Sequence, residues 1–386
     1  MSGRTGHRFA PAEGIGGDTP GEPVRAYRYP DGHIGWLVTG YAEARTVLAD
    51  TRFSSRAESK RVPVHRPGAE PFIGQQPPPG WFIDLDPPEH TRFRRALMAW
   101  FTMRRIERFR SVVERVVEEH LDAIARLPQP VDLVEAFAFP VPLAVICHVL
   151  GVPNSSHELL RRHSNTLFSL ESSAADGTAA MRALTELVAD VVARKRRHPG
   201  DDVLSALAAN LRHDEAAGAG VLLLTAGHET VASMLGLGVL TLLDRPELRD
   251  ALHPDTVGAF VEELLRHLSI LHLGVPRGAQ QDVTVGGKLI RAGQSVTISL
   301  PAGNRDAARF PQPAVCNPQR RTAGHLAFGF GVHQCVGAHL ARLELSVGYP
   351  AVFRRFPTLR LAVPVDEVPI TRHGAVYGAA RLPVVW

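Results

Sequence analysis

One cysteine near the C-terminus stands where a thiolate would be chemically useful. Cys335 lies in the run Phe328-Gly329-Phe330-Gly331-Val332-His333-Gln334-Cys335-Val336-Gly337, and a helical pattern follows from residue 338. Unpaired N–H groups at the start of a helix favour negative charge. We therefore expect a lowered thiol pKa and a sulfur that binds a metal or attacks an electrophile. Gly331 and Gly337 would let backbone approach a flat ligand, and Phe328 could cover the sulfur. The alternative is a buried structural cysteine.

A second unusual stretch, Ala226-Gly227-His228-Glu229-Thr230, lies inside a long apolar run that predicts a helix. Glycine inside a helix costs about 1 kcal/mol relative to alanine, and a buried acid or hydroxyl needs a partner or water. Ala226 and Gly227 could leave room for a diatomic ligand, and Glu229 and Thr230 could relay protons to it. The alternative is a kinked core helix with a satisfied polar pair, since kinks often occur at glycine.

Together these stretches resemble the haem-ligand loop and the oxygen-activation kink of the cytochrome P450 family. The resemblance implies a mainly α-helical prism with a small β-rich region, enclosing haem b (iron protoporphyrin IX). It implies that Cys335 is the axial iron ligand, because a thiolate donates electron density and favours O–O cleavage. It also implies catalytic roles for Ala226, Gly227, Glu229 and Thr230.

Haem carries two propionates, and the resemblance extends to the cations that would hold them. The segment from Asp86 to Arg95 resembles the family's helix over the propionates, with His90 and Arg94 four residues apart and on one face. The resemblance places Arg277 and His333 at two further propionate positions, and Phe328 and Gly337 beside the cofactor. Charge-assisted hydrogen bonds from arginine to carboxylate are strong and directional. For His325 we expect a structural hydrogen bond.

Glu263 and Arg266 are three residues apart on a predicted helix and share a face. Taken alone they would be an ordinary surface ion pair. The family joins such a pair to an arginine from a later loop, here Arg320, so the resemblance implies a triad that stabilises the fold. Cys316 stands where the family usually has phenylalanine, a departure in this loop.

The resemblance also implies an apolar substrate pocket, with His272 as one possible polar contact. For any single residue of this pocket, plain core packing is the alternative. The pocket segments are the proline-rich loop before Trp81, residues 167–170, Leu222 and Leu223, residues 270–273 and residues 375–377.

Helical periodicity dominates the elements that must position these residues. Strands are fewer: residues 24–29 and 34–39 predict a hairpin, residues 283–290 a tight hairpin at Gly286-Gly287, and residues 295–300 and the tail further strands. Helices are predicted at 41–49, 89–101, 104–126, 142–150, 156–170, 179–197, 203–211, 217–243, 255–268 and from 338 to about 353.

The composition is that of an ordinary globular protein, with 386 residues, 45% hydrophobic, 21% charged and a net charge of +4. The length suggests two or three domains. Because motifs from residue 90 to residue 337 serve one expected site, we predict a loosely ordered segment at 1–20 and a single domain at 21–386.

Charge, cysteines and apolar runs limit the partners and the compartment. No basic run indicates nucleic-acid binding, and three cysteines form no disulfide framework. The longest apolar run, residues 221–225, is too short to span a bilayer. We therefore expect a cytoplasmic protein with no membrane anchor.

The resemblance implies monooxygenation of a small apolar molecule, by hydroxylation or epoxidation, in secondary metabolism. Ferredoxin and ferredoxin reductase would supply electrons, because no flavin or iron–sulfur segment is visible. Two alternatives stay open. One is the same fold performing oxidative coupling, desaturation or peroxide-driven chemistry. The other is a non-catalytic helper protein, which would be expected to lose the thiolate ligand.

Overall fold

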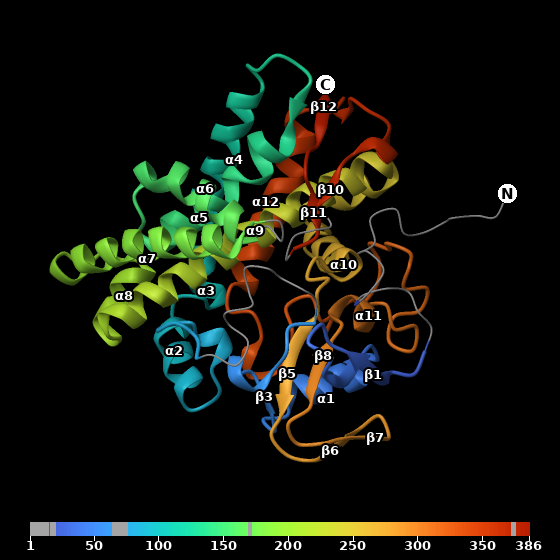
Figure 1. The fold of residues 1–386 in the computed structure, drawn as a ribbon. Coiled ribbons are helices and arrows are strands. Elements are labelled where there is room, and N and C mark those ends of the chain that lie inside the picture. The colour runs from blue at the N-terminus through green and yellow to red at the C-terminus, as the bar shows by residue number, and fades with distance from the viewer. Residues whose placement is uncertain (1–14, 16–20, 64–75, 169–171, 372–375) are drawn as a thin grey trace.

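The computed structural model describes residue 15 and residues 21–63, 76–168, 172–371 and 376–386. Helices form most of the molecule, and the largest sheet lies at one end with α1 (Figure 1). The predicted mainly α-helical class is confirmed. The helices are α1 (Tyr41–Ala49), α2 (Glu89–Met98), α3 (Met103–Glu107), α4 (Arg110–Ile124), α5 (Pro140–Leu150), α6 (His157–Phe168), α7 (Ala174–Arg197), α8 (Val203–Asn210), α9 (His213–Asp244), α10 (Val257–Leu268), α11 (Leu300–Asn304) and α12 (Ala338–Arg355).

The strands form one five-stranded sheet and three small ones. The large sheet has the order β1-β2-β8-β5-β3, in which only the β2–β8 pair is parallel. Both predicted hairpins, β1–β2 and β6–β7, are confirmed. The strands are β1 (Val24–Arg28), β2 (Ile34–Val38), β3 (Phe53–Ser54), β4 (Val131–Asp132), β5 (Val275–Ala279), β6 (Val283–Val285), β7 (Lys288–Ile290), β8 (Ser295–Ile298), β9 (Arg360–Leu361), β10 (Ile370–Thr371), β11 (Gly378–Ala379) and β12 (Pro383–Val385).

Several helix boundaries differ from the predicted ones, and capping explains two of them. The single helix predicted at 104–126 is two helices, and the Thr102 hydroxyl caps the first by accepting from the Arg105 N–H at 3.3 Å. Helix α7 begins five residues earlier than predicted, because the Ser173 hydroxyl accepts from the Asp176 N–H at 3.1 Å. A short π-helix at Val134–Ala138, which the sequence did not predict, leads into α5.

Helix α9 is the central helix of the apolar core and contacts α5, α7 and α12. Its length and apolar composition would suffice to cross a membrane, but 72% of its most apolar window is buried inside the protein, the placement of a core helix. Gly238 shows how closely α12 approaches: a Cβ there would lie 2.2 Å from the hydroxyl of Tyr349, which donates to the Met234 carbonyl at 2.6 Å.

Candidate active site

The loop that carries Cys335 folds against the end of α1. Gly329 and Gly331 have φ values of +68° and +76°, a region that favours glycine. A Cβ at Gly331 would lie 2.4 Å from the Leu48 carbonyl oxygen, so this glycine serves protein packing and not the approach of a flat ligand. The Cys335 N–H donates to the Phe328 carbonyl at 2.9 Å and closes the loop just before α12.

Gly337, the last residue before α12, differs from Gly331. A Cβ there would lie 3.9 Å from the Cys335 sulfur, which is an ordinary contact. Packing among the described residues therefore does not require glycine at this position. Its place beside a flat ligand stays a prediction.

Cys335 is exposed, yet protein atoms surround it closely enough that burial raises the pKa of its thiol. Both observations hold if the sulfur lines a hollow inside the protein. The Gly337 N–H, Arg94 and Arg342 act in the opposite direction but do not prevail. The predicted lowering of the thiol pKa is therefore wrong in direction, because loss of solvation outweighs the N–H groups at the helix start.

Two histidine rings from distant segments lie in contact beside this loop, tilted by 41° to each other. The rings of His90, on α2, and His333, in a short 3₁₀ helix at Gly331–His333, are 4.0 Å apart. Nδ1 of His90 and Nε2 of His333 are buried without a hydrogen-bond partner in the described structure. Burial, with neighbouring arginines, lowers the pKa of His90 to about 4 and that of His333 to about 2. Both rings are therefore neutral here.

Arg277, on β5, adds a charge to this group. It is 6% exposed, and its guanidinium donates to the neighbouring Pro276 carbonyl at 2.9 Å. Burial lowers its pKa to about 10, against the opposing effect of Asp86 and Asp84. Asp86 already accepts hydrogen bonds from Ser54 and Ser55. The guanidinium thus keeps donors to spare.

Arg94 reaches the cysteine loop from α2. Its guanidinium donates to the Gln334 carbonyl at 2.9 Å, and burial lowers its pKa against the opposing effect of the nearby Cys335. The structure therefore brings together the four residues predicted to face the propionates, His90, Arg94, Arg277 and His333, of which only the two arginines are charged. Buried donors without partners need a hydrogen-bonding ligand, and carboxylates suit them. These residues fit haem with its propionates.

The sequence analysis missed Lys60, which follows a 3₁₀ helix at Ala57–Ser59. Lys60 forms an ion pair with Asp84, which lies in a 3₁₀ helix at Phe82–Asp84. Burial lowers the pKa of Lys60, and Arg277 lowers it further; the charge of Lys60 in turn lowers the pKa of His333. Lys60 therefore belongs to the same group. No local pattern marks this lysine, because its neighbours come from the segment before α2, from β5 and from the cysteine loop.

On α9, Ala226 is exposed although most of the helix is buried, so open space lies beside it. The Thr230 hydroxyl donates to the Ala226 carbonyl at 2.9 Å. Nε2 of His228 lies 3.7 Å from a carboxylate oxygen of Glu229. Thr230 and Glu229 thus lie within about one turn of this open position, and their roles in proton delivery stay predictions.

Gly227 has a packing role. A Cβ there would lie 2.8 Å from Ile146 of α5, so glycine allows the two helices to pack closely. Helix α9 runs without interruption from His213 to Asp244. The space for a diatomic ligand and the kink stay predictions.

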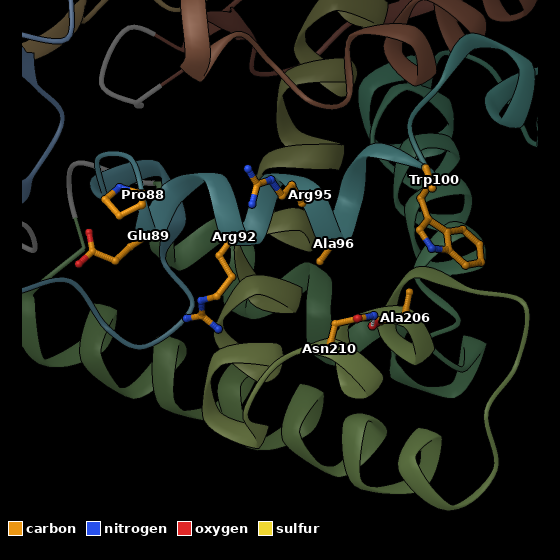
Figure 2. A pocket seen from close by; sticks show the side chains of 9 residues that line it. Pro88, Glu89, Arg92, Arg95, Ala96, Trp100, Ala206 and Asn210 are labelled. Carbon is orange, nitrogen blue, oxygen red and sulfur yellow. Dashed lines mark hydrogen bonds between the residues drawn. The ribbon is translucent and has the colours of Figure 1, made fainter.

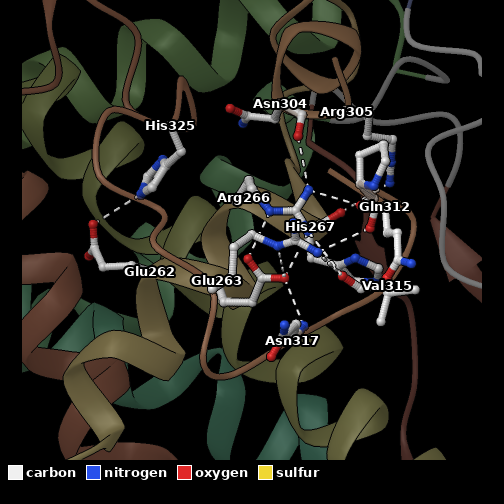
Figure 3. A network of polar contacts seen from close by, with 12 residues as sticks. Glu262, Glu263, Arg266, His267, Asn304, Arg305, Gln312, Val315, Asn317 and His325 are labelled. Atoms are coloured by element: carbon white, nitrogen blue, oxygen red, sulfur yellow. Dashed lines mark hydrogen bonds and ion pairs between the residues drawn. The ribbon is translucent and has the colours of Figure 1, made fainter. Parts of the chain in front are cut away.

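The predicted stabilising triad is confirmed (Figure 3). Arg266 donates two hydrogen bonds to Glu263 at 2.8 Å, and Arg320 donates a third at 3.1 Å. The Asn317 N–H also donates to Glu263 at 2.8 Å. Cys316, the departure in this loop, is buried in the apolar core at 2% exposure.

A second acid beside the triad holds the cysteine loop to α12. Glu262 accepts from His325 at 3.1 Å, the predicted structural hydrogen bond (Figure 3). It also accepts from Arg342 at 2.6 Å. Arg342 lies over the Phe328 ring at 4.6 Å. Burial opposes the charge on Glu262, but His325 and Arg342 prevail and lower its pKa to about 2.

Only some of the segments predicted to line the substrate pocket lie among the residues that the structure describes. Residues 64–75, 169–171 and 372–375 lie outside the described residues, as does the predicted loose segment 1–20 except residue 15. Leu222, Leu223 and His272 are buried. The Tyr377 N–H donates to the Ile270 carbonyl at 2.9 Å, which joins two of the predicted segments.

A surface groove of about 770 Å³ lies elsewhere, between α2 and α8 (Figure 2). Ala96 and Ala206 line it, and Arg92 at its edge holds Glu215 of α9 through two hydrogen bonds. The predicted site residues are not among those that line this groove. It is therefore separate from the candidate site.

Comparison with known proteins agrees with this geometry. The sequence model described as Cytochrome P450 matches residues 256–376. The chain is 42% identical over 369 residues to Cytochrome P450 105C1 of Streptomyces sp, covering 94% of this chain and 92% of that protein. It is 41% identical over 380 residues to Vitamin D3 dihydroxylase of Streptomyces griseolus, covering 96% and 92%.

Solved structures are similar over nearly the whole length. CYP105P1 in complex with filipin I has a TM-score of 0.90 at 38% identity, covering 98% of this chain and 96% of that one. GfsF has a TM-score of 0.89 at 38% identity, covering 99% and 98%.

Proposed function

Because this chain belongs to the cytochrome P450 family and is a haem-thiolate monooxygenase, we propose that Cys335 ligates the iron of haem b. One observation carries the assignment. His90, Arg277 and His333 form a buried group beside the Cys335 loop. One ring nitrogen of each histidine has no partner among the described residues and Arg277 has donors to spare, so the two propionates would satisfy them. Arg94 would complete this set.

Other residues would surround the cofactor. Phe328, held under Arg342, would cover the sulfur, and Gly337 would leave space beside the ring. When bound, the haem supplies oxygen chemistry, in which a thiolate ligand favours cleavage of the O–O bond. We take residues 21–386 as a single domain, since the main apolar cluster, from Phe82 to Val384, and the cluster of the large sheet, from Val24 to Leu326, both pack against Leu271.

On the protein side, Thr230 and Glu229 would manage protons. The Thr230 hydroxyl donates to the Ala226 carbonyl, and rotation of this side chain would turn the same proton toward the open space beside Ala226. Glu229, whose side chain is 16% exposed, would then replace that proton. Positioned proton transfer of this kind typically contributes 10²–10⁴-fold to a rate.

Electrons would come from a ferredoxin and a ferredoxin reductase in the cytoplasm. The chain has three cysteines, fewer than the four that ligate a common iron–sulfur cluster. Cys147 and Cys316 are moreover buried. A separate electron carrier would therefore be needed.

The substrate would be an apolar small molecule of secondary metabolism, hydroxylated or epoxidised. Similar proteins include a nocardicin C N-oxygenase and a mycinamicin VIII C21 methyl hydroxylase bound to mycinamicin VIII. Buried Leu222 and Leu223 would offer apolar contacts, and His272 a polar one. Oxidative coupling or desaturation is the second candidate, and analysis of the product separates it from oxygen insertion.

The test is spectroscopic. Reduced protein with carbon monoxide should show the red-shifted Soret band of thiolate ligation, and its pyridine complex should identify haem b. Cys335→Ala should abolish that band, whereas Cys147→Ala, which changes a buried cysteine in the apolar core, should keep it. Survival of the thiolate-type band in Cys335→Ala would refute the assignment.

A further inference from the structure

The proposed function leaves one buried ionisable side chain on α9 unexplained. His228 is 0% exposed, and its Nδ1 lies 2.9 Å from the Leu224 carbonyl. Because a carbonyl can only accept, Nδ1 carries a hydrogen and Nε2 of the neutral ring is an acceptor. This Nε2 has no hydrogen-bond partner among the described residues, yet it lies 3.7 Å from a carboxylate oxygen of Glu229.

Packing alone does not require a histidine here. The ring of Phe139 meets the His228 ring edge-on, with centroids 5.2 Å apart. Phenylalanine at position 228 would make a similar contact without burying a polar nitrogen, and buried polar atoms without partners are costly. The orphan Nε2 faces an acid that must be reprotonated in every cycle, so it has a chemical use.

We propose that His228 is the proton reservoir for Glu229, an inference that rests on the proposed roles of Glu229 and Thr230. After Glu229 has given its proton toward Thr230, the protonated His228 gives its Nε2 proton to the Glu229 carboxylate. One N–H bond breaks and one O–H bond forms, which leaves neutral imidazole and a neutral acid. Rotation of the carboxylate shortens the 3.7 Å separation to a hydrogen bond.

His228 then needs a proton from water, and a crevice supplies a route. Phe139 also lines a crevice of about 360 Å³ that is bordered by α4, α5 and α6. Phe139 therefore contacts both the His228 ring and this crevice. The ionisable groups of the crevice are Arg115 and His120 from α4, Glu135 from the π-helix, His148 from α5, and His157 and Arg161 from α6, with Glu119 and Glu158 beside them.

The experiment compares two substitutions in the haem-loaded enzyme. His228→Asn keeps a donor near the Nδ1 position, and His228→Gln keeps a polar group near Nε2, but neither side chain stores a proton. Both should slow turnover about tenfold, raise the solvent deuterium isotope effect and lower the product formed per reduced nicotinamide consumed. His198→Asn, at an exposed histidine that ends α7, should change none of these quantities.

The outcomes separate this inference from the proposed function. A wild-type enzyme without the thiolate-type carbon monoxide band would refute the proposed function itself. If that band is present, two results would overturn the proposal that His228 is a proton reservoir. One is an unchanged solvent deuterium isotope effect in both variants, and the other is wild-type behaviour of His228→Gln. If the His228 variants fail to bind haem, Phe139→Leu provides the test instead. A smaller side chain at position 139 should ease the passage of protons from the crevice to His228 and so lower the solvent deuterium isotope effect. An unchanged isotope effect in Phe139→Leu would overturn the proposal.

Discussion

Glu344 of α12 is an acid buried without a partner, and its replacement should remove a pH-dependent loss of stability. It is 1% exposed, and neither carboxyl oxygen has a hydrogen-bond partner among the described residues. Burial raises its pKa well above the ordinary value. Glu263 is equally buried, at 0% exposure, but holds Arg266 and Arg320. The two acids therefore form a matched pair.

The direction of the pH dependence of stability follows from proton binding. Because the folded-state pKa of Glu344 is raised, the folded protein keeps a proton that the unfolded chain releases above its ordinary pKa. The free energy of unfolding therefore falls by about 1.4 kcal/mol for each pH unit until the folded-state pKa is reached. Glu344→Gln keeps the shape and removes this titration, so between pH 5 and pH 6 it should gain about 1.4 kcal/mol relative to wild type.

The assay is denaturant unfolding of the haem-loaded protein at pH 5, 6 and 7, followed by far-ultraviolet circular dichroism. Groups that titrate alike in wild type and Glu344→Gln contribute equally to both free energies of unfolding, so they cancel in the difference between the two proteins. The matched control, Glu263→Gln, should instead destabilise by about 3–5 kcal/mol, since it leaves buried arginines without their acid. A difference between wild type and Glu344→Gln that does not vary with pH would refute the reasoning.

Two further predictions concern the candidate site. Arg277→Ala and Arg94→Ala should each lose haem on gel filtration. The control Arg28→Ala, which changes an exposed arginine of β1, should retain its haem. Full Soret absorbance per protein in both site variants would contradict the propionate assignment. Thr230→Ala should bind substrate and accept electrons as wild type does but divert reducing equivalents to peroxide or water. The control Thr225→Ala removes a comparable hydroxyl, which donates to the Val221 carbonyl of the same helix, and it should form as much product per reduced nicotinamide as wild type. If Thr230→Ala also forms as much product per reduced nicotinamide as wild type, protons reach the site another way.

Local sequence predicts most of the elements because their causes are local. Gly286 and Gly287 both adopt positive φ, at 54° and 75°, and their pairing alone indicates the β6–β7 turn. Helix α1 has its predicted bounds because its apolar spacing is helical. Helix α7 starts earlier than predicted because the capping hydroxyl of Ser173 lies before the first apolar repeat.

Resemblance extended the prediction to pairs far apart in the chain. Arg320 could be assigned to Glu263 only because the family joins the two, although 57 residues separate them. The same holds for His90 and His333, whose rings are 4.0 Å apart. Neither pairing follows from spacing, since a long-range contact depends on how whole elements pack.

The sequence by itself therefore determined most of the elements and the family, and it named the residues that we propose for the chemistry. Only the tertiary structure decided what surrounds each of them. Burial raises the pKa of the Cys335 thiol, although its place before a helix predicted the reverse. Ile146 explains Gly227, and Asp84 holds Lys60. Solvation, close packing and long-range charge depend on atoms from distant segments, which local sequence patterns do not specify.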